Sequence, residues 1–378
     1  MQGERTQTGL WKNPEISGEY GERRIKDSAG ELQNEGTTRR ISVTQTFEFP
    51  GKASLRKAIA NQNMTLAQLG LKQFEQSLEG QVRSLAVQYQ RASQNAEAAG
   101  EISERSHGLV KLLQERSLPG TQQLLELRII EGTLIGLQES TKEFVQLREE
   151  SRIALNALLG VPSSLALKIE SISELPSIKI EEESALILLG LSHNLQLKMR
   201  TVELEKAIQS VTAERLEVAP DFSVGPFLSQ DKAGDREENY GGTVSLTIPL
   251  WNWNQGNIAK AKAHRAQADA MLLEARRKVE GEIARCYRAY ELNRKLIEQI
   301  PENRMNQLRE AADLADRQYR TGSVGVQLFL EMQRGYLSSL QTRNAALLNL
   351  WRNWLDLNLL TGGGMRISQS PALSKGSQ

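Results

Sequence analysis

The sequence predicts a mainly α-helical protein with a small β part, built as two copies of one pattern. In each copy, a pair of strands accompanies a very long antiparallel helical hairpin. Three observations lead to this fold class. Ala, Leu, Glu, Gln, Arg and Lys dominate, while aromatic residues make up 5% and prolines number 10, which is typical of long helices. Segments about 200 residues apart resemble each other. Some segments alternate between apolar and polar residues before the period changes to that of a helix.

The overall charge and the single cysteine exclude several classes of function. The chain has 47 basic and 46 acidic residues in interspersed order, with a formal charge of +1. This leaves no basic field for binding nucleic acid. Cys286 stands alone, so an internal disulfide and a multi-cysteine metal site are both excluded.

Hydropathy decides how the chain could meet a membrane. The mean hydropathy is −0.44. The longest apolar run, ALILLGL at 185–191, is far shorter than the ~20 residues of a spanning helix, so a membrane role would have to use strands. The first residues, MQGERTQTGLW, lack the basic start and apolar core of a signal peptide. Taken literally, this start predicts a chain that stays in the cytoplasm.

The internal repeat sets the expected organisation. LEGQVRSLAVQYQ (78–90) aligns with VEGEIARCYRAYE (279–291), and ALNALLG (154–160) aligns with DLNLLTG (356–362). Both pairs lie about 200 residues apart, an offset kept over more than half of the chain. The chain is therefore expected to divide into a first repeat, a linker, a second repeat and a disordered tail: 1–162, 163–183, 184–363 and 364–378.

The strand pairs are expected at 13–24 with 39–49, and at 220–231 with 239–251. In the last of these, Val244, Leu246, Ile248 and Leu250 interleave with Thr243, Ser245, Thr247 and Pro249. Long polar loops, 24–38 and 231–239, separate the paired strands. From alternation alone, an ordinary antiparallel sheet over a core is the favoured interpretation. A transmembrane barrel, with strands of ~10 residues and polar outer loops, is the alternative.

The helices are expected at 51–117, 121–160, 184–218, 255–321 and 325–361. The two longest would each extend roughly 95 Å, which is wider than any single-domain core. Bends are expected at Gly100 and at Pro301, which lies at the equivalent position of the second repeat. Coiled-coil spacings in the second hairpin predict that such helices pack along one another. Gly, Pro and Ser in RSLPGT (116–121) and RTGSVGV (320–326) predict tight reversals.

Four segments resemble recurring segments of the outer-membrane efflux proteins of the TolC type. These segments are GLWKNPEIS, TFEFPGKASLRKAIA, IPLWNWNQGNIAKAKA and YRTGSVGVQLFLEMQ, and the resemblance covers roughly residues 9–363. It implies a homotrimer in which each protomer gives four strands to a twelve-stranded outer-membrane β-barrel. The helices would form a trimeric α-barrel across the periplasm, with tips that dock an adaptor attached to an inner-membrane pump. FEFPGK (47–52) is similar to the heavy-metal branch of the family.

The resemblance also implies two sets of functional residues. The adaptor-docking tips would be Leu118, Pro119, Gly120, Thr121, Gly322, Ser323, Val324 and Gly325. The alternative is that these residues only form the turn that any helical hairpin needs. A periplasmic gate would comprise Glu126, Tyr319 and Glu331, with symmetry-repeated carboxylates favouring cations. Against this, Leu328 replaces an acid of the family, and a glutamate on a charged helix is usually a solvated residue.

Other residues that can carry chemistry do not form a catalytic constellation. His107, His193 and His264 are dispersed and lack metal-ligand spacing. Cys286 is expected to be a small packing residue, and Trp351 and Trp354, one helical turn apart, are expected in a core. No enzyme activity, no metal and no cofactor is therefore expected.

The beginning of the chain departs from the family pattern. That pattern has a signal sequence and an outer helix before the first strand pair, whereas here only MQGERTQTGL precedes it. We expect either a misassigned start or a truncated copy.

The function hypothesis is a passive exit channel of a tripartite (RND-type) efflux or type I secretion system, exporting small molecules or metal ions. It would lie in the outer membrane of a Gram-negative-type cell and extend into the periplasm. The alternatives are a soluble coiled-coil scaffold, a periplasmic adaptor-like protein or a non-functional remnant. An adaptor would have further β-domains with continuous cores, and this chain offers only two strand pairs.

Overall fold

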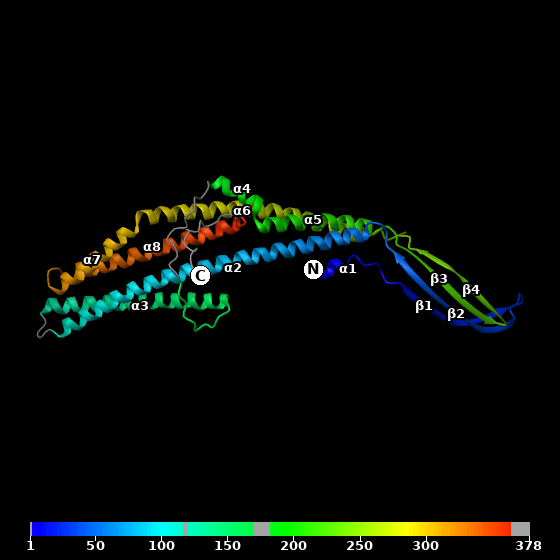
Figure 1. Ribbon diagram of the computed structural model, residues 1–378, viewed down its shortest axis with the longest axis horizontal. Helices are drawn as coiled ribbons and strands as arrows, with labels where there is room; N and C mark the ends of the chain where they lie inside the picture. The colour runs from blue at the N-terminus through cyan, green and yellow to red at the C-terminus, as the bar shows by residue number, and fades with distance from the viewer. Residues whose placement is uncertain (1, 116–119, 170–181, 364–378) are drawn as a thin grey trace, which may run out of the picture. The chain divides into compact units, whose positions relative to one another are not determined.

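A computed structural model describes residues 2–115, 120–169 and 182–363, and Figure 1 labels their helices and strands. In chain order the elements are α1 (Gln2–Gln7), β1 (Glu15–Lys26), β2 (Leu32–Phe47), α2 (Lys52–Glu115), α3 (Thr121–Leu159), α4 (Glu183–His193), α5 (Leu195–Leu216), β3 (Phe222–Ala233), β4 (Asp235–Leu246), α6 (Gln255–Gln299), α7 (Glu302–Arg320) and α8 (Val326–Leu360). The mainly α fold with a small sheet is confirmed. Within the described ranges, no helix has both the length and the apolar character needed to cross a membrane.

The chain forms two compact units, and each unit draws on both sequence repeats. The first unit comprises residues 1–71 and 196–275, and the second comprises 72–195 and 276–378. The first unit holds all four strands and α5, apart from its first residue. The second unit holds α3, α4, α7 and α8. The compact units therefore do not coincide with the two successive sequence repeats, and the division into repeats stays a prediction. The expected tail, 364–378, and most of the expected linker lie outside the described residues.

In the first unit, the four strands form one antiparallel sheet in the order β1-β2-β3-β4. The register places Ile41 opposite both Gly18 and Leu228, and Leu228 opposite Tyr240. Directly paired residues share a face of the sheet, so the alternation of all four strands is in phase. One face is apolar and carries Ile16, Tyr20, Ile41, Val43, Phe47, Phe222, Val224, Leu228, Tyr240, Val244 and Leu246.

The opposite face of the sheet is polar and internally bonded. The hydroxyls of Ser17 and Ser42 are 2.7 Å apart, and those of Thr46 and Ser223 are 2.9 Å apart. The Arg40 guanidinium lies 4.3 Å from the centroid of the Phe227 ring. The sheet therefore has one apolar face and one polar face, on which neighbouring hydroxyl groups bond to each other.

The predicted long loops between paired strands are wrong. β1 continues to Lys26 and β2 begins at Leu32, so only residues 27–31 turn the chain. The carboxylate of Asp27 accepts hydrogen bonds from the backbone N–H groups of Ala29, at 3.0 Å, and Glu31, at 2.9 Å. Between β3 and β4 only Gly234 remains, with φ +92°. Hydrogen bonds between the backbones of neighbouring strands do not require apolar side chains. The strands therefore continue into polar segments, where alternation of apolar and polar residues could not reveal them.

Asp221 joins the sheet to the start of α2 in the first unit. Its carboxylate accepts hydrogen bonds from the ammonium groups of Lys52 (2.9 Å) and Lys12 (3.1 Å), and from the Phe49 backbone N–H (3.1 Å). Burial alone would raise the pKa of Asp221, but these three donors outweigh it and lower the pKa to about 2. The charge of the buried Lys52 is therefore compensated where strand gives way to helix.

The second unit is built around α8. Leu347, Leu350, Trp354 and Leu357 are fully buried there, and the Trp351 and Trp354 rings meet edge to face at 5.6 Å. The predicted core role of both tryptophans is confirmed. Cys286 of α6 is also fully buried, which confirms its prediction as a packing residue.

Two helices predicted as single elements are interrupted, one of them at Pro301, where a bend was expected. The expected helix 255–321 ends as α6 at Gln299 and resumes as α7 at Glu302, since Pro301 has no N–H to donate. The carbonyl oxygen of Ile300 instead accepts a hydrogen bond from Nε of the buried Arg343, at 3.0 Å. The expected helix 184–218 breaks at Asn194, whose side-chain amide donates to the Leu360 carbonyl oxygen at 2.9 Å. By contrast, α2 runs through Gly100 as one helix.

Candidate partner-docking tip and gate

The predicted tip residues of the first hairpin are only partly described. Leu118 and Pro119 lie outside the described residues. Gly120 is the N-cap of α3 with extended backbone (φ −67°, ψ 162°), and Thr121 is the first helical residue. Gly120 and Thr121 are exposed.

The second tip is described in full. The chain leaves α7 at Thr321 and turns at Gly322, whose φ of +75° is a left-handed conformation that favours glycine. The N–H of Gly322 bonds to the Tyr319 carbonyl oxygen at 3.0 Å, and that of Ser323 to the Gln318 carbonyl oxygen at 2.9 Å. Gly325 then caps α8. The tip therefore presents small side chains and backbone on a fixed turn.

A buried cluster supports the tips from behind and joins both hairpins. It comprises Leu109 of α2, Ile130 of α3, and Val326, Phe329 and Leu330 of α8. Tyr319, at the end of α7, stacks on the Phe329 ring with a centroid distance of 5.3 Å and an interplanar angle of 18°. This packing holds the Tyr319 ring, and therefore its hydroxyl, in one position.

The structure brings together two of the three predicted gate residues. The hydroxyl of Tyr319 donates a hydrogen bond to the carboxylate of Glu126 on α3, at 3.4 Å. The bond therefore links the second hairpin to the first, through residues far apart in the sequence. Glu331 is exposed on α8, and its carboxylate has no ion pair with a residue that the structure describes. Leu328 is about half exposed.

Sequence reasoning missed a charged network that joins α2 to α7. Arg105 forms ion pairs with Asp313 and, at 3.7 Å, with Glu101 on its own helix. Arg309 reaches Glu101 at 3.2 Å. The signal was present as opposite charges four residues apart in both segments, but this spacing is equally typical of solvated helix faces. Only the packed structure shows that Arg105 pairs with Asp313, and Arg309 with Glu101, between the two helices.

A second missed contact joins α3 to α8 further from the tips. The Arg334 guanidinium donates a hydrogen bond to the Thr133 hydroxyl at 2.8 Å. With Tyr319–Glu126 and the α2–α7 ion pairs, it belongs to a set of polar links between the two hairpins near the tips. All of these links are charged or half-exposed, so they can be broken without opening the apolar cluster.

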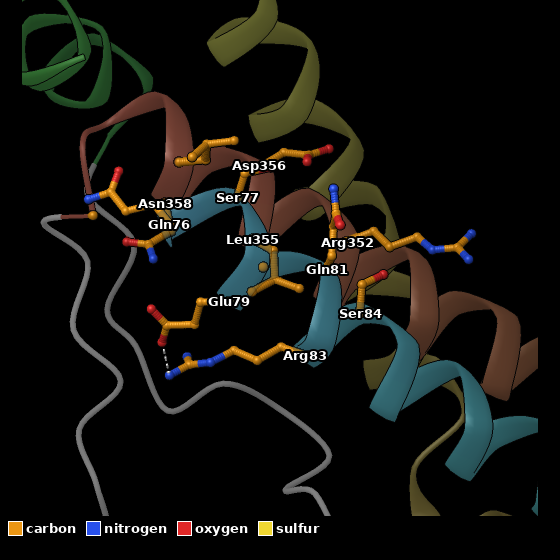
Figure 2. A pocket seen from close by; sticks show the side chains of 13 residues that line it. Gln76, Ser77, Glu79, Gln81, Arg83, Ser84, Arg352, Leu355, Asp356 and Asn358 are labelled. Carbon is orange, nitrogen blue, oxygen red and sulfur yellow. Dashed lines mark ion pairs between the residues drawn. The ribbon is translucent and has the colours of Figure 1, made fainter. Parts of the chain in front are cut away.

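Figure 2 shows a polar groove of about 890 Å³ between α2 and α8 in the second unit. Glu79 and Arg83, paired at 2.6 Å, lie along its α2 side, and Arg352 and Asp356 come from α8. The described residues include no group of His, Cys, Asp and Glu suited to a metal. Burial raises the pKa of the nearby Cys286 thiol to about 11, which keeps it protonated and unreactive. This groove offers hydrogen bonds and charge, but its residues do not form a nucleophile–base pair.

Comparison with known proteins shows what the chain is similar to. Residues 186–363 match the family described as outer membrane efflux protein. The match covers just under half of the chain and shows what this part of the chain is similar to. This match confirms that the chain resembles the outer-membrane efflux proteins of the TolC type. Among curated protein sequences, none matches this chain significantly.

Solved structures extend the fold similarity to nearly the whole chain. A membrane protein from Pseudomonas aeruginosa matches with a TM-score of 0.73 at 15% identity, covering 96% of this chain and 83% of the other. The Campylobacter jejuni CmeC outer membrane channel gives 0.72 at 17%, covering 97% and 81%. The open state of the Neisseria gonorrhoeae MtrE outer membrane channel gives 0.71 at 16%, covering 97% and 84%. At these identities the similarity establishes the fold.

Proposed function

We propose that the chain is one protomer of a homotrimeric, passive exit channel in the outer membrane. Its partners are a periplasmic adaptor and an inner-membrane pump of a tripartite (RND-type) efflux or type I secretion system, and its cargo is small molecules or metal ions. The observation that carries this proposal is the uncovered apolar face of the four-stranded sheet. It is supported by the family match of residues 186–363.

The apolar face of the sheet is exposed to an extent that a water-soluble protein avoids. Ile16, Tyr240 and Val244 are 75%, 86% and 76% exposed. From the level of Phe47 to that of Tyr20, the strands advance about eight residues, or roughly 27 Å. A transmembrane barrel carries an apolar band of about 25 Å. A soluble scaffold would have to cover this face, so lipid contact is the simpler explanation.

The ends of the sheet favour closure with other copies. β1 and β4 are its outer strands and pair on one side only, and an unpaired edge is not viable in lipid. Closing the sheet with strands from further copies removes both edges. Three copies would give a twelve-stranded barrel, as the resemblance implies.

Exposed aromatic residues lie between the sheet and the helices. Trp11 precedes β1, while Trp251 and Trp253 follow β4, and all three are more than half exposed. Tryptophan is enriched at membrane–water interfaces, where its ring is partly apolar and its N–H remains hydrated. In the proposed channel these residues mark the periplasmic boundary of the membrane.

The tips provide the docking surface for the adaptor in this proposal. The described tip residues Gly120, Thr121, Gly322, Ser323 and Gly325 are exposed and small. Leu118, Pro119 and Val324 complete the proposed docking set. The gate is closed by links such as Tyr319–Glu126, and opens when a docked partner separates α7 from α3. Glu126 and Glu331 then contribute negative charge to the pore and favour cations.

Reconstitution of the full chain in planar bilayers tests channel and gate separately. The wild type should insert as trimers with discrete conductance steps of low open probability. Tyr319→Phe removes the hydroxyl that bonds to Glu126 and keeps the ring stacked on Phe329. We expect it to raise the open probability several-fold.

Tyr336→Phe is the matched control, because Tyr336 is a half-buried α8 tyrosine packed against the cluster of Ala98, Ala99 and Ile102 rather than at the tip. It should leave the open probability unchanged. Absence of any conductance from the wild type would contradict the channel. A normal wild-type channel with equal behaviour of both variants would contradict only the gate.

A further inference from the structure

The first unit contains a groove that the proposed channel function does not use. Its volume is about 360 Å³, and α5 and α6 form its two walls. The lining residues are Glu203, Lys206, Ala207, Ser210 and Glu214 of α5, and Asn257, Lys260, Ala261 and His264 of α6. The volume falls within the range of small-ligand sites.

The groove is hollow because its walls carry small residues. Ala207 and Ala261 supply only methyl groups at the level where longer side chains would fill the space. Ala261 is buried, with 8% of its surface exposed. Longer polar side chains stand around this floor, so a ligand in the groove would meet apolar methyl groups beneath it and charged groups at its sides.

Both ends of the groove are clamped by polar contacts. At one end, the Asn254 side-chain amide donates to the Glu214 carbonyl oxygen (2.9 Å) and to its carboxylate (2.8 Å). Asn254 adopts the left-handed backbone conformation, φ 55°, immediately before α6. At the other end, Arg200 contacts Sδ of Met271 at 3.9 Å. These contacts hold α5 and α6 in place, so the space between them is preformed.

The charges in the groove are unequally engaged. The Glu203 carboxylate is paired with Arg200 at 2.7 Å, and that of Glu214 accepts the Asn254 amide. By contrast, the side chains of Lys206, Lys260 and His264 make no hydrogen bond or ion pair with any residue that the structure describes. Glu203 is thus compensated by a cation and Glu214 is hydrogen-bonded by a neutral amide, while the basic side chains have no acidic partner among the described residues. The available charge is cationic and converges on a preformed hollow.

The position at the start of α6 adds to this preference for an anion. Asn257 and Lys260 lie in the first two turns of α6, which begins at Gln255. The N-terminal end of a helix carries a partial positive charge from its unpaired N–H groups. Two lysines, an imidazole and a helix N-terminus on one small groove match a compact, multiply charged anion, for which lysine is a frequent ligand as a point charge.

We propose that the groove between α5 and α6 binds a phosphate group, with Lys206 and Lys260 as its principal ligands and His264 and Asn257 as polar supports. The same chemistry is offered by inorganic phosphate and by the phosphodiester of an anionic lipid headgroup. This site goes beyond the proposed channel function, since it uses none of the proposed gate or tip residues. Its presence can be measured whether or not the chain conducts.

The test uses the full chain in a non-ionic detergent and two probes. Inorganic phosphate is followed by equilibrium dialysis, and short-chain phosphatidylglycerol is followed by native mass spectrometry against phosphatidylcholine. The variant Lys206→Gln/Lys260→Gln should weaken binding at least ten-fold, while Lys206→Arg/Lys260→Arg should largely retain it. Lys262→Gln is the matched control, because Lys262 is exposed on the same helix but does not line the groove.

Lysine footprinting provides a second readout without any substitution. In the wild type, the bound probe should slow acetylation of Lys206 and Lys260 and leave Lys262 unaffected. Binding of phosphate alone identifies a soluble anion, and binding of phosphatidylglycerol in preference to phosphatidylcholine identifies a lipid headgroup. Binding of neither probe, or an equal loss in the Lys262→Gln control, would overturn the proposal.

Discussion

The two longest helical stretches of the molecule occupy equivalent positions in the two repeats but differ in continuity. α2 is a single helix of 64 residues, whereas its counterpart consists of α6, with 45 residues, and α7, with 19. The interruption falls at Pro301, and the equivalent position in α2 is Gly100. The same architecture therefore tolerates both a continuous helix and a broken one.

The difference shows which breaker residues matter in a packed helix. Glycine costs about 1 kcal/mol relative to alanine but keeps its N–H, and α2 continues through Gly100. Proline removes a hydrogen bond and collides with the preceding turn. The second repeat compensates for this, because Arg343 of α8 donates to the Ile300 carbonyl oxygen. The break is thus part of a packed arrangement with its own buried partner.

Copying the break into the first repeat should have the largest effect. Gly100→Pro should destabilise the chain by at least ~3 kcal/mol, the cost of proline in a helix interior. Gly100 lies beside the buried cluster of Ala98, Ala99 and Ile102, so displacement of the helix there also disturbs packing. The free energy of unfolding, measured by denaturant titration of the detergent-solubilised chain, checks this.

Two controls define the origin of that loss. Gly100→Ala should stabilise by up to ~1 kcal/mol, because a Cβ at Gly100 would meet open space. Pro301→Ala should change stability much less than Gly100→Pro, since Arg343 and α8 already hold that turn. A Gly100→Pro loss no larger than that of Pro301→Ala would show that α2 tolerates a break as well as α6–α7 does.

The two repeats also differ in how equivalent apolar residues are covered. Leu71 of α2 and Leu272 of α6 correspond in the alignment that pairs Glu79 with Glu280. Leu272 is 8% exposed and Leu71 is 60% exposed. Leu272→Ala should therefore cost about 3 kcal/mol, as for a core leucine. Leu71→Ala should stay within ~0.5 kcal/mol, as for a surface site.

Thermal and denaturant unfolding of both alanine variants measures this contrast directly. If both variants lose about 3 kcal/mol of unfolding free energy, Leu71 is covered by another chain in the assembled protein. If neither variant loses a measurable amount, Leu272 is less well packed than its exposure indicates. Either result would change the comparison between the repeats in a defined way.

Much of the fold could be read from the sequence because long helices and repeats leave strong periodic signals. The expected helix 51–117 corresponds to α2 (Lys52–Glu115) within two residues at each end. The break at Asn194 was not foreseen, because its cause is a distant acceptor, the Leu360 carbonyl oxygen. The strand ends were missed for a similar reason: hydrogen bonding between β3 and β4 extends through polar residues.

The candidate site was predictable only as far as local sequence determines it. The turn at Gly322 follows from its glycine and the neighbouring Ser and Thr, and it is found in the structure. Tyr319 and Glu126 were named through family resemblance, and their contact depends on packing across four helices. The crossed ion pairs of Glu101, Arg105, Arg309 and Asp313 could not be distinguished from surface charges before the helix faces were known.

The smallest expected effect concerns the joints between sheet and helices, which differ between the repeats. The joint at α2 uses charge, with Asp221 held by Lys52 and Lys12. The joint at α6 uses the neutral amide of Asn254 on Glu214. Because the Asp221 pKa falls to about 2 in the folded chain, its ionised form stabilises folding. That contribution is complete above the ordinary aspartate pKa near 4 and is lost as the pH falls toward 2.

Asp221→Asn should therefore lower the free energy of unfolding by on the order of 2 kcal/mol at neutral pH. The gap between wild type and variant should close as the pH falls from about 4 to about 2. Asp269→Asn, at an exposed aspartate of α6, is the control and should follow the wild type throughout. A gap that stays constant over this range would show that Asp221 acts through its shape and hydrogen bonds, and that the charged joint works in the same manner as the neutral joint at Asn254.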